Sequence, residues 1–131
     1  MALASVMKLD VVSVHAVMPY VHVSDVERSI GFYRLFGFEV VSRWPYEGNP
    51  GAAFMESGTA RMLLAPASAP IDAAAQAALF YMYVADVAAL RRKLTAIGIT
   101  VTDVTYPDYM PKGEIGVVDP DGYCVLIGQL R

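Results

Sequence analysis

The pattern of hydrophobic and polar positions changes period in the same order twice along the chain. Two apolar stretches rich in Val, Tyr and Phe, at 17–23 and 79–84, predict strands. Each is followed by a segment whose apolar residues stand three or four positions apart, which predicts an amphipathic helix with one apolar stripe. Further strand-like stretches follow each helix. Each half of the chain therefore reads strand, helix, strand, strand, strand.

The two halves align at a constant offset. Val23-Ser24-Asp25-Val26 lies 61 positions before Val84-Ala85-Asp86-Val87, and the same offset pairs Gly37 with Gly98. Both glycines are placed to end a helix in the left-handed conformation, which glycine adopts without a steric penalty. Because the matches fall on positions that begin and end elements, they indicate an internal repeat.

Capping and turn signals set the expected bounds of the elements. Ser24 with Glu27 forms an S-x-x-E capping box ahead of the first helix, and Asp86 or Ala85 opens the second. Turns are expected at 57–58 and at Pro120-Asp121-Gly122. The other expected strands are 38–41, 53–56 and 61–65 in the first half, and 99–104, 115–118 and 123–127 in the second.

The repeat predicts one structural domain of the α+β class. A first βαβββ module is expected at 14–65 and a second at 79–129. The segment 66–78 is rich in Pro and Ala, and it is expected to be a connector with room for one helical turn. Roughly 60 residues bury only a marginal core alone, so the two modules are expected to fold together.

Composition narrows the partners. The 131 residues are 56% hydrophobic, which predicts an ordered core, and the net charge of −3 with scattered basic residues argues against nucleic acid. No apolar run reaches the roughly 18 residues of a membrane span, and the start resembles no secretory signal. The single cysteine, Cys124, suits a reducing compartment. We therefore predict a cytoplasmic protein with no membrane partner.

The signatures HVSDVERSIGFYRLFGFEV and DPDGYCVLIG, with the order of elements and the offset, resemble the vicinal oxygen chelate superfamily over about residues 14–129. That superfamily includes glyoxalases, extradiol dioxygenases and bleomycin-resistance proteins. The resemblance implies two βαβββ modules whose eight strands form a partly open, barrel-like cleft, often completed by dimerisation. It implies less about activity, since the same scaffold hosts metal enzymes and metal-free binders.

The resemblance also implies three metal-ligand positions. Counted from the aligned aspartates, they fall on Met18, Leu79 and Leu126. Zinc, iron and manganese prefer imidazole or carboxylate ligands, and a thioether suits soft metals alone. His15 and His22 are seven positions apart, so on a regular strand they face opposite sides and cannot share an ion. We therefore predict no metal and no other cofactor.

Strand alternation anchored on these positions predicts an apolar cleft with phenolic edges. Toward the cleft it directs Ala16, Tyr20, Tyr81, Tyr83 and Cys124, and under the helices Val17, Val21, Phe80, Met82, Val84, Val125 and Ile127. Aromatic loops at 44–46 and 106–110 are expected to form rims, and Glu56 and Glu114 could supply charge. The predicted ligand-binding residues are Met18, Tyr20, His22, Trp44, Tyr46, Glu56, Leu79, Tyr81, Tyr83, Tyr106, Tyr109, Glu114, Cys124 and Leu126. For each aromatic, a place in the core or in a dimer interface is the alternative.

The leading hypothesis is a homodimer that sequesters an aromatic or amphipathic small molecule without metal and without catalytic residues. A metal-dependent lyase, isomerase or dioxygenase is an alternative if the register is misplaced or a second chain donates ligands. A metal-free enzyme is the third hypothesis, with Glu56, Glu114 or a cleft tyrosine as acid or base.

Overall fold

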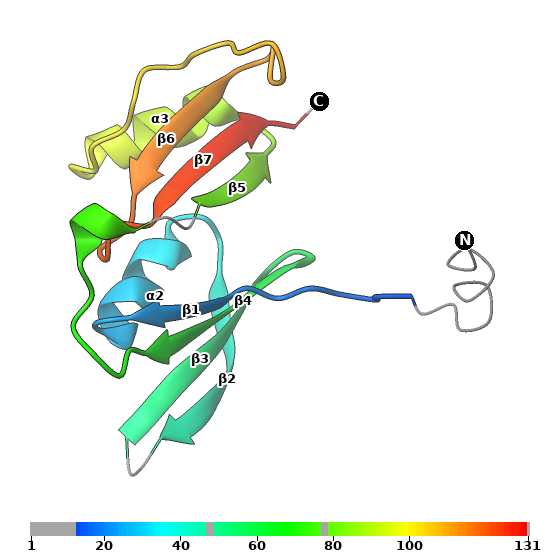
Figure 1. Ribbon diagram of the computed structural model, residues 1–131. Helices are drawn as coiled ribbons and strands as arrows, with labels where there is room; N and C mark the ends of the chain where they lie inside the picture. Colours follow the sequence, from blue (N-terminus) through cyan, green and yellow to red (C-terminus); the bar gives the residue numbers. More distant parts are fainter. Residues whose placement is uncertain (1–12, 47–48, 77–78, 131) are drawn as a thin grey trace, which may run out of the picture.

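The computed structural model describes residues 13–46, 49–76 and 79–130, which form two sheets and two helices (Figure 1). The first half contains β1 (Tyr20–Val23), α2 (Val26–Arg34), β2 (Glu39–Tyr46), β3 (Asn49–Ser57) and β4 (Ala60–Pro66). A 3-10 turn, η1 (Ala73–Ala75), lies in the connector. The second half contains β5 (Leu79–Val84), α3 (Val87–Ala96), β6 (Glu114–Val118) and β7 (Cys124–Gln129). Among the described residues, neither helix has the length and apolar character to cross a membrane.

Each half builds one sheet around a parallel strand pair. The first sheet has the order β1-β4-β3-β2 and the second β5-β7-β6, with β1 parallel to β4 and β5 parallel to β7. The remaining neighbours in each sheet are antiparallel. The α+β fold is therefore confirmed, with two open sheets of four and three strands rather than a closed barrel.

The segment 99–104 is not a strand, so the described residues form seven strands where eight were expected. Thr102 explains why the ladder is not built. Its backbone N–H donates to the carbonyl of Gly116 at 3.1 Å, but its side-chain hydroxyl, not a backbone carbonyl, accepts the N–H of Gly116 at 2.8 Å. Farther along, Thr105 and Glu114 form one isolated bridge beside β6.

The two helices begin at aspartates. Asp25, not Ser24, caps α2, because its side chain accepts the backbone N–H of Arg28 at 3.1 Å. The expected Ser24 capping box is therefore wrong: Ser24 instead donates its backbone N–H at 3.1 Å, and its hydroxyl, to Asp121 of the other half. Asp86 caps α3 as expected and accepts a backbone N–H at 2.9 Å.

Both helices end at the expected glycines, with φ of 85° at Gly37 and 89° at Gly98. Replacing Gly98 with alanine should lower the free energy of unfolding by about 1 kcal/mol, because a Cβ makes this left-handed conformation unfavourable. Gly31 of α2 is the matched control: a Cβ there meets no atom within 4 Å, and its φ is not positive. Gly31→Ala should instead raise the free energy of unfolding by about 0.5 kcal/mol. Urea titration of both variants measures the two changes. If both variants changed the free energy of unfolding in the same direction, the left-handed conformation of Gly98 would not be the cause.

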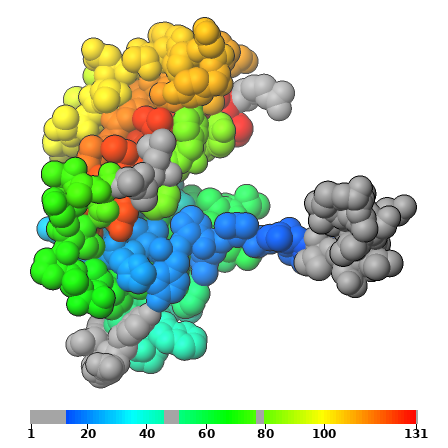
Figure 2. All heavy atoms as spheres, viewed as in Figure 1, coloured from blue at the N-terminus to red at the C-terminus, as the bar shows by residue number. Residues whose placement is uncertain are grey.

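One apolar core runs through both halves. It unites buried side chains of the first sheet and α2, such as Met55 and Tyr33, with Leu94 of α3 and Ile127 of β7. The strand parity expected for the core holds for Val21, Val125 and Ile127, which are buried, and for Phe80, Met82 and Val84, which pack against the core. Val17 is the exception. It is 82% exposed because β1 begins three residues later, and residues 13–19 lead away from the body (Figures 1 and 2).

The turn between β6 and β7 joins the two halves. The phenol of Tyr33 in α2 donates to Asp119 at 2.6 Å, and the other oxygen of Asp119 accepts the backbone N–H groups of Asp121 and Tyr123 at 2.9 Å each. The guanidinium of Arg28 lies 3.8 Å from Asp121. Asp119 and Asp121 are both buried. The Asp-Pro-Asp-Gly turn is thus a structural junction that holds α2 against the second sheet.

Candidate functional site

Each sheet has one face that its helix does not cover. On the first sheet, Tyr20 of β1 pairs with Leu63 of β4, which also pairs with Phe54 of β3. With Trp44 and Ala52 these side chains line a small cavity of about 190 Å³. Tyr20 was predicted to face the cleft, whereas Trp44 was predicted on a rim loop and instead lies in β2, paired with Ala52. Phe54 and Leu63 were missed, although the two-residue alternation of their hairpin places them on this face.

The uncovered face of the second sheet carries tyrosines and a carboxylate. Across β5, β7 and β6 the register places Tyr81 opposite Leu126, and Tyr83 and Glu114 on either side of Gly128. Because these positions share the same parity, their side chains lie on one face. Gly128 leaves room there: a Cβ at this position would lie 2.9 Å from the phenolic oxygen of Tyr81 and 2.6 Å from Cε of Met110.

Three of the predicted residues meet at this face. Tyr81 donates its phenolic hydrogen to one carboxylate oxygen of Glu114 at 2.6 Å, and Tyr109 donates to the other oxygen at 3.0 Å. Glu114 is only 7% exposed. We call Tyr81, Tyr83, Tyr109 and Glu114 the tyrosine cluster, because the ring of Tyr83 lies 5.2 Å from that of Tyr81.

Protonation in the cluster follows from these contacts. Burial, and then the hydrogen bond to Glu114, raises the pKa of Tyr81 above its ordinary value of 10.0. The hydrogen bond to Glu114, followed by burial, raises the pKa of Tyr109 in the same direction. Both phenols are therefore neutral donors at neutral pH. They are poorly suited to act as proton-abstracting bases there.

Two larger hollows border the second sheet. One of about 450 Å³ is lined by Tyr83, Tyr109, Met110, Pro111, Lys112, Gln129 and Leu130. Another of about 710 Å³ lies between the 98–102 segment and the sheet, and its lining includes Phe32, Ile99, Thr102, Cys124 and Leu126. Both volumes are in the range of small-molecule sites, and both linings are largely apolar.

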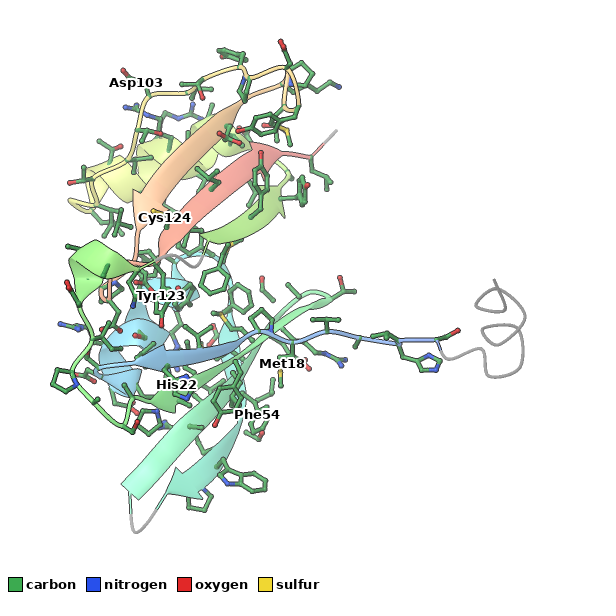
Figure 3. The ribbon with its side chains drawn as sticks, in the orientation of Figure 1. Met18, His22, Phe54, Asp103, Tyr123 and Cys124 are labelled. Atoms are coloured by element: carbon green, nitrogen blue, oxygen red, sulfur yellow. The ribbon has the colours of Figure 1, made fainter. Side chains whose placement is uncertain are left out.

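Apart from Leu126, which lies opposite Tyr81, the other predicted residues stand apart from the cluster. Figure 3 shows Met18 and His22 with the first sheet and Cys124 with the second. The ring of His22 lies 5.0 Å from that of Tyr20, and Glu56 forms an ion pair with Arg61 at 3.1 Å. Tyr106 is exposed on its loop. The side chains of Tyr46 and Leu79 lie outside the described residues.

The residues at the implied metal positions do not fit a transition metal. Met18 precedes β1, and Leu126 pairs across the sheet with Tyr81. A methionine and a leucine offer neither an imidazole nor a carboxylate at these positions. Within the described part of the chain, no three His, Cys, Asp or Glu side chains gather into a group that could hold a metal.

Comparison with known proteins identifies the class. Residues 13–127 match the Glyoxalase/Bleomycin resistance protein/Dioxygenase superfamily. The chain therefore belongs to that superfamily, which confirms the resemblance seen in the sequence. None of the curated proteins searched matches the chain.

Solved structures share the fold at low sequence identity. A bleomycin-binding protein complexed with bleomycin is 18% identical, with a TM-score of 0.73, and the match covers 90% of this chain and 100% of that one. TnmS3, an antibiotic binding protein from Streptomyces sp. CB03234, is 20% identical with a TM-score of 0.71, over 93% of this chain and 99% of that one. Lactoylglutathione lyase from Agrobacterium tumefaciens is 24% identical with a TM-score of 0.67, over 88% and 93%. Binding proteins and an enzyme thus share this scaffold.

Proposed function

We propose that this protein binds and sequesters an aromatic or amphipathic small molecule without a metal and without breaking a bond. The observation that carries the proposal is the uncovered face of the second sheet. It combines largely apolar hollows with one anchored polar group, the carboxylate of Glu114 held by two phenols. Apolar walls with few polar groups are the usual form of a small-molecule site. The bleomycin-binding and antibiotic-binding neighbours agree with such a role.

Burial of apolar ligand surface supplies the main favourable contribution to binding at such a site. Removing about 300 Å² of apolar ligand surface from water contributes roughly 7 kcal/mol, before the cost of association is subtracted. Aromatic side chains at the border, such as Tyr83 and Tyr109, can stack a planar ligand. Affinity from burial, with orientation set by hydroxyl and carboxylate groups, requires no chemical step.

We further propose that the functional unit is a homodimer in the cytoplasm. Tyr20 and Trp44 are 51% and 60% exposed on the first sheet, and Val14 and Val17 on the extended segment are 76% and 82% exposed. A second copy placed over these apolar side chains would bury them and close the open faces. The exposed free thiol of Cys124 suits a reducing compartment. Sedimentation velocity tests the dimer directly, and a monomer at micromolar concentration would contradict it.

A thermal-shift screen tests the proposed function. Protein purified without chelators is heated with a library of aromatic natural products and antibiotics, and separately with divalent metals. A bound compound at 100 times its dissociation constant should add about 2.7 kcal/mol to the stability of the folded state. Compounds that stabilise the protein and are recovered unchanged support sequestration.

Two outcomes contradict the proposal. A stoichiometric transition metal found by elemental analysis would favour the metal-dependent lyase or dioxygenase instead. Conversion of a stabilising compound by metal-free protein would favour a metal-free enzyme. For that enzyme Glu114 is a better candidate than Glu56, whose carboxylate is already engaged by Arg61.

A further inference from the structure

We propose that the tyrosine cluster recognises an organic cation, such as an alkylammonium group carried by an aromatic or amphipathic ligand. The inference rests on the proposed function and names the chemical class of its ligand. It follows from three features of the second sheet: a buried carboxylate without a cationic partner, three adjacent aromatic rings, and an adjoining cavity of about 450 Å³.

The carboxylate of Glu114 is buried but not neutralised by a cation. Two phenols donate to it, and within the described residues it forms no ion pair. Phenolic hydrogen bonds satisfy the oxygens but leave the negative charge in place. By contrast, Glu27, Glu39 and Glu56, on more exposed parts of the fold, each pair with an arginine. Burying an unpaired charge is costly, and a bound cation would offset that cost.

The rings around Glu114 present surfaces that favour a cation. The ring of Tyr81 lies 5.2 Å from that of Tyr83 and 6.4 Å from that of Tyr109. Tyr83 and Tyr109 are 61% and 65% exposed, and both line the adjoining cavity. The face of an aromatic ring is negative, so several rings beside a carboxylate attract a quaternary ammonium group more than a neutral group of the same shape.

Lys112 lines the same cavity and carries the same positive charge as the cation proposed to bind beside Glu114. Its side chain is exposed and forms no ion pair among the described residues. A positive charge at the rim weakens the attraction for a bound cation. Removing the positive charge of Lys112 should therefore strengthen binding of the cation, whereas removing the negative charge of Glu114 should weaken it.

The probes are two compounds of nearly identical shape, the (4-hydroxyphenyl)trimethylammonium ion and neutral 4-tert-butylphenol. Both are titrated into the full chain by isothermal calorimetry. We expect the cation to bind about tenfold more tightly than the neutral compound, a difference typical of a cation over aromatic rings beside a carboxylate. Equal binding, or tighter binding of the neutral compound, would overturn the inference.

Substitutions identify the side chains that produce the preference for the cation. Glu114→Gln should weaken binding of the cation severalfold and leave the neutral compound unchanged, and Lys112→Met should strengthen binding of the cation severalfold. Tyr83→Leu keeps apolar area on an exposed side chain, so it tests a ring without disturbing the fold. It should weaken the cation selectively. Glu39→Gln on the first sheet is the matched control and should change neither affinity.

The outcomes separate this inference from the proposed function. If the library screen yields a neutral ligand, but the cation shows no preference and Glu114→Gln has no effect, the cation inference fails while sequestration stands. If neither probe binds, the cation inference also fails. If the library yields no ligand of any charge either, the proposed function fails with it.

Discussion

Replacing Asp119 with alanine should lower the free energy of unfolding by about 3 kcal/mol or more. The carboxylate accepts three hydrogen bonds, from the phenol of Tyr33 and from the backbone N–H groups of Asp121 and Tyr123. Asp119 is 4% exposed, so water cannot readily replace it. Hydrogen bonds to a charged group contribute about 1.5–3 kcal/mol each, and a buried donor left unpaired costs about 1–3 kcal/mol. Urea unfolding of both proteins measures the difference.

Two further variants identify the cause of that loss. Asp119→Asn keeps an oxygen that accepts both backbone N–H groups, and its amide can donate to the oxygen of Tyr33, so it should retain most of the stability. Asp108→Ala removes an exposed carboxylate from a loop and should change stability by less than about 0.5 kcal/mol. If Asp119→Ala resembled Asp108→Ala, the turn would not be the junction between the two halves.

The pH dependence of this junction has a defined sign. Burial raises the pKa of Asp119 above its ordinary value of 3.8, although the hydrogen bonds it accepts lower it. A raised pKa means that the folded protein holds the proton more tightly than the unfolded chain. The pH-dependent part of its contribution to stability is therefore fully present below 3.8 and is lost as the pH rises through the folded-state pKa, while the hydrogen bonds to the ionised carboxylate remain above it. The difference between wild type and Asp119→Asn should move in favour of wild type as the pH falls from neutrality toward that range.

The features of the fold that depend on neighbouring residues were predictable from the sequence. Gly37 and Gly98 end their helices because a residue without Cβ adopts positive φ readily, and that requirement is local. Asp86 caps α3 through a backbone group three residues away. Alternation along β7 correctly assigned Val125 and Ile127 to the core, because it too depends only on neighbouring positions of the strand.

The features that depend on distant residues were not predictable. Ser24 has the right type and spacing for a capping box, but Asp121, far along the chain, takes its hydroxyl. Strand propensity at 99–104 did not reveal that the hydroxyl of Thr102 would replace a backbone acceptor. In the candidate site, Tyr81, Tyr109 and Glu114 were each proposed singly. The hydrogen bond from Tyr81 crosses β7 between two strands that are not neighbours, and the one from Tyr109 depends on the loop before β6 folding back, and no local pattern encodes either.

Gly128 provides the most direct test of the tyrosine cluster. A Cβ at this position would lie 2.6 Å from Cε of Met110 and 2.9 Å from both Cε1 and the phenolic oxygen of Tyr81. Met110 can move at its flexible end, but the rigid ring of Tyr81 must leave its place over β7. Gly128→Ala should therefore cost about 1–3 kcal/mol of stability and break the Tyr81–Glu114 hydrogen bond.

The phenol itself reports whether the bond is broken. Once Tyr81 leaves Glu114 and becomes more exposed, its pKa should fall toward 10.0, because burial and that hydrogen bond are the causes that raise it. Tyrosine ring carbons followed by NMR during an alkaline titration measure this change without any ligand. Gly116→Ala is the matched control on the same face: its nearest neighbour, Cδ2 of Leu126 at 3.3 Å, can give way, so the pKa of Tyr81 should stay raised. If the pKa of Tyr81 were unchanged in Gly128→Ala, Tyr81 would still reach Glu114 with a Cβ present at position 128. The tyrosine cluster would then not depend on glycine at this position of β7.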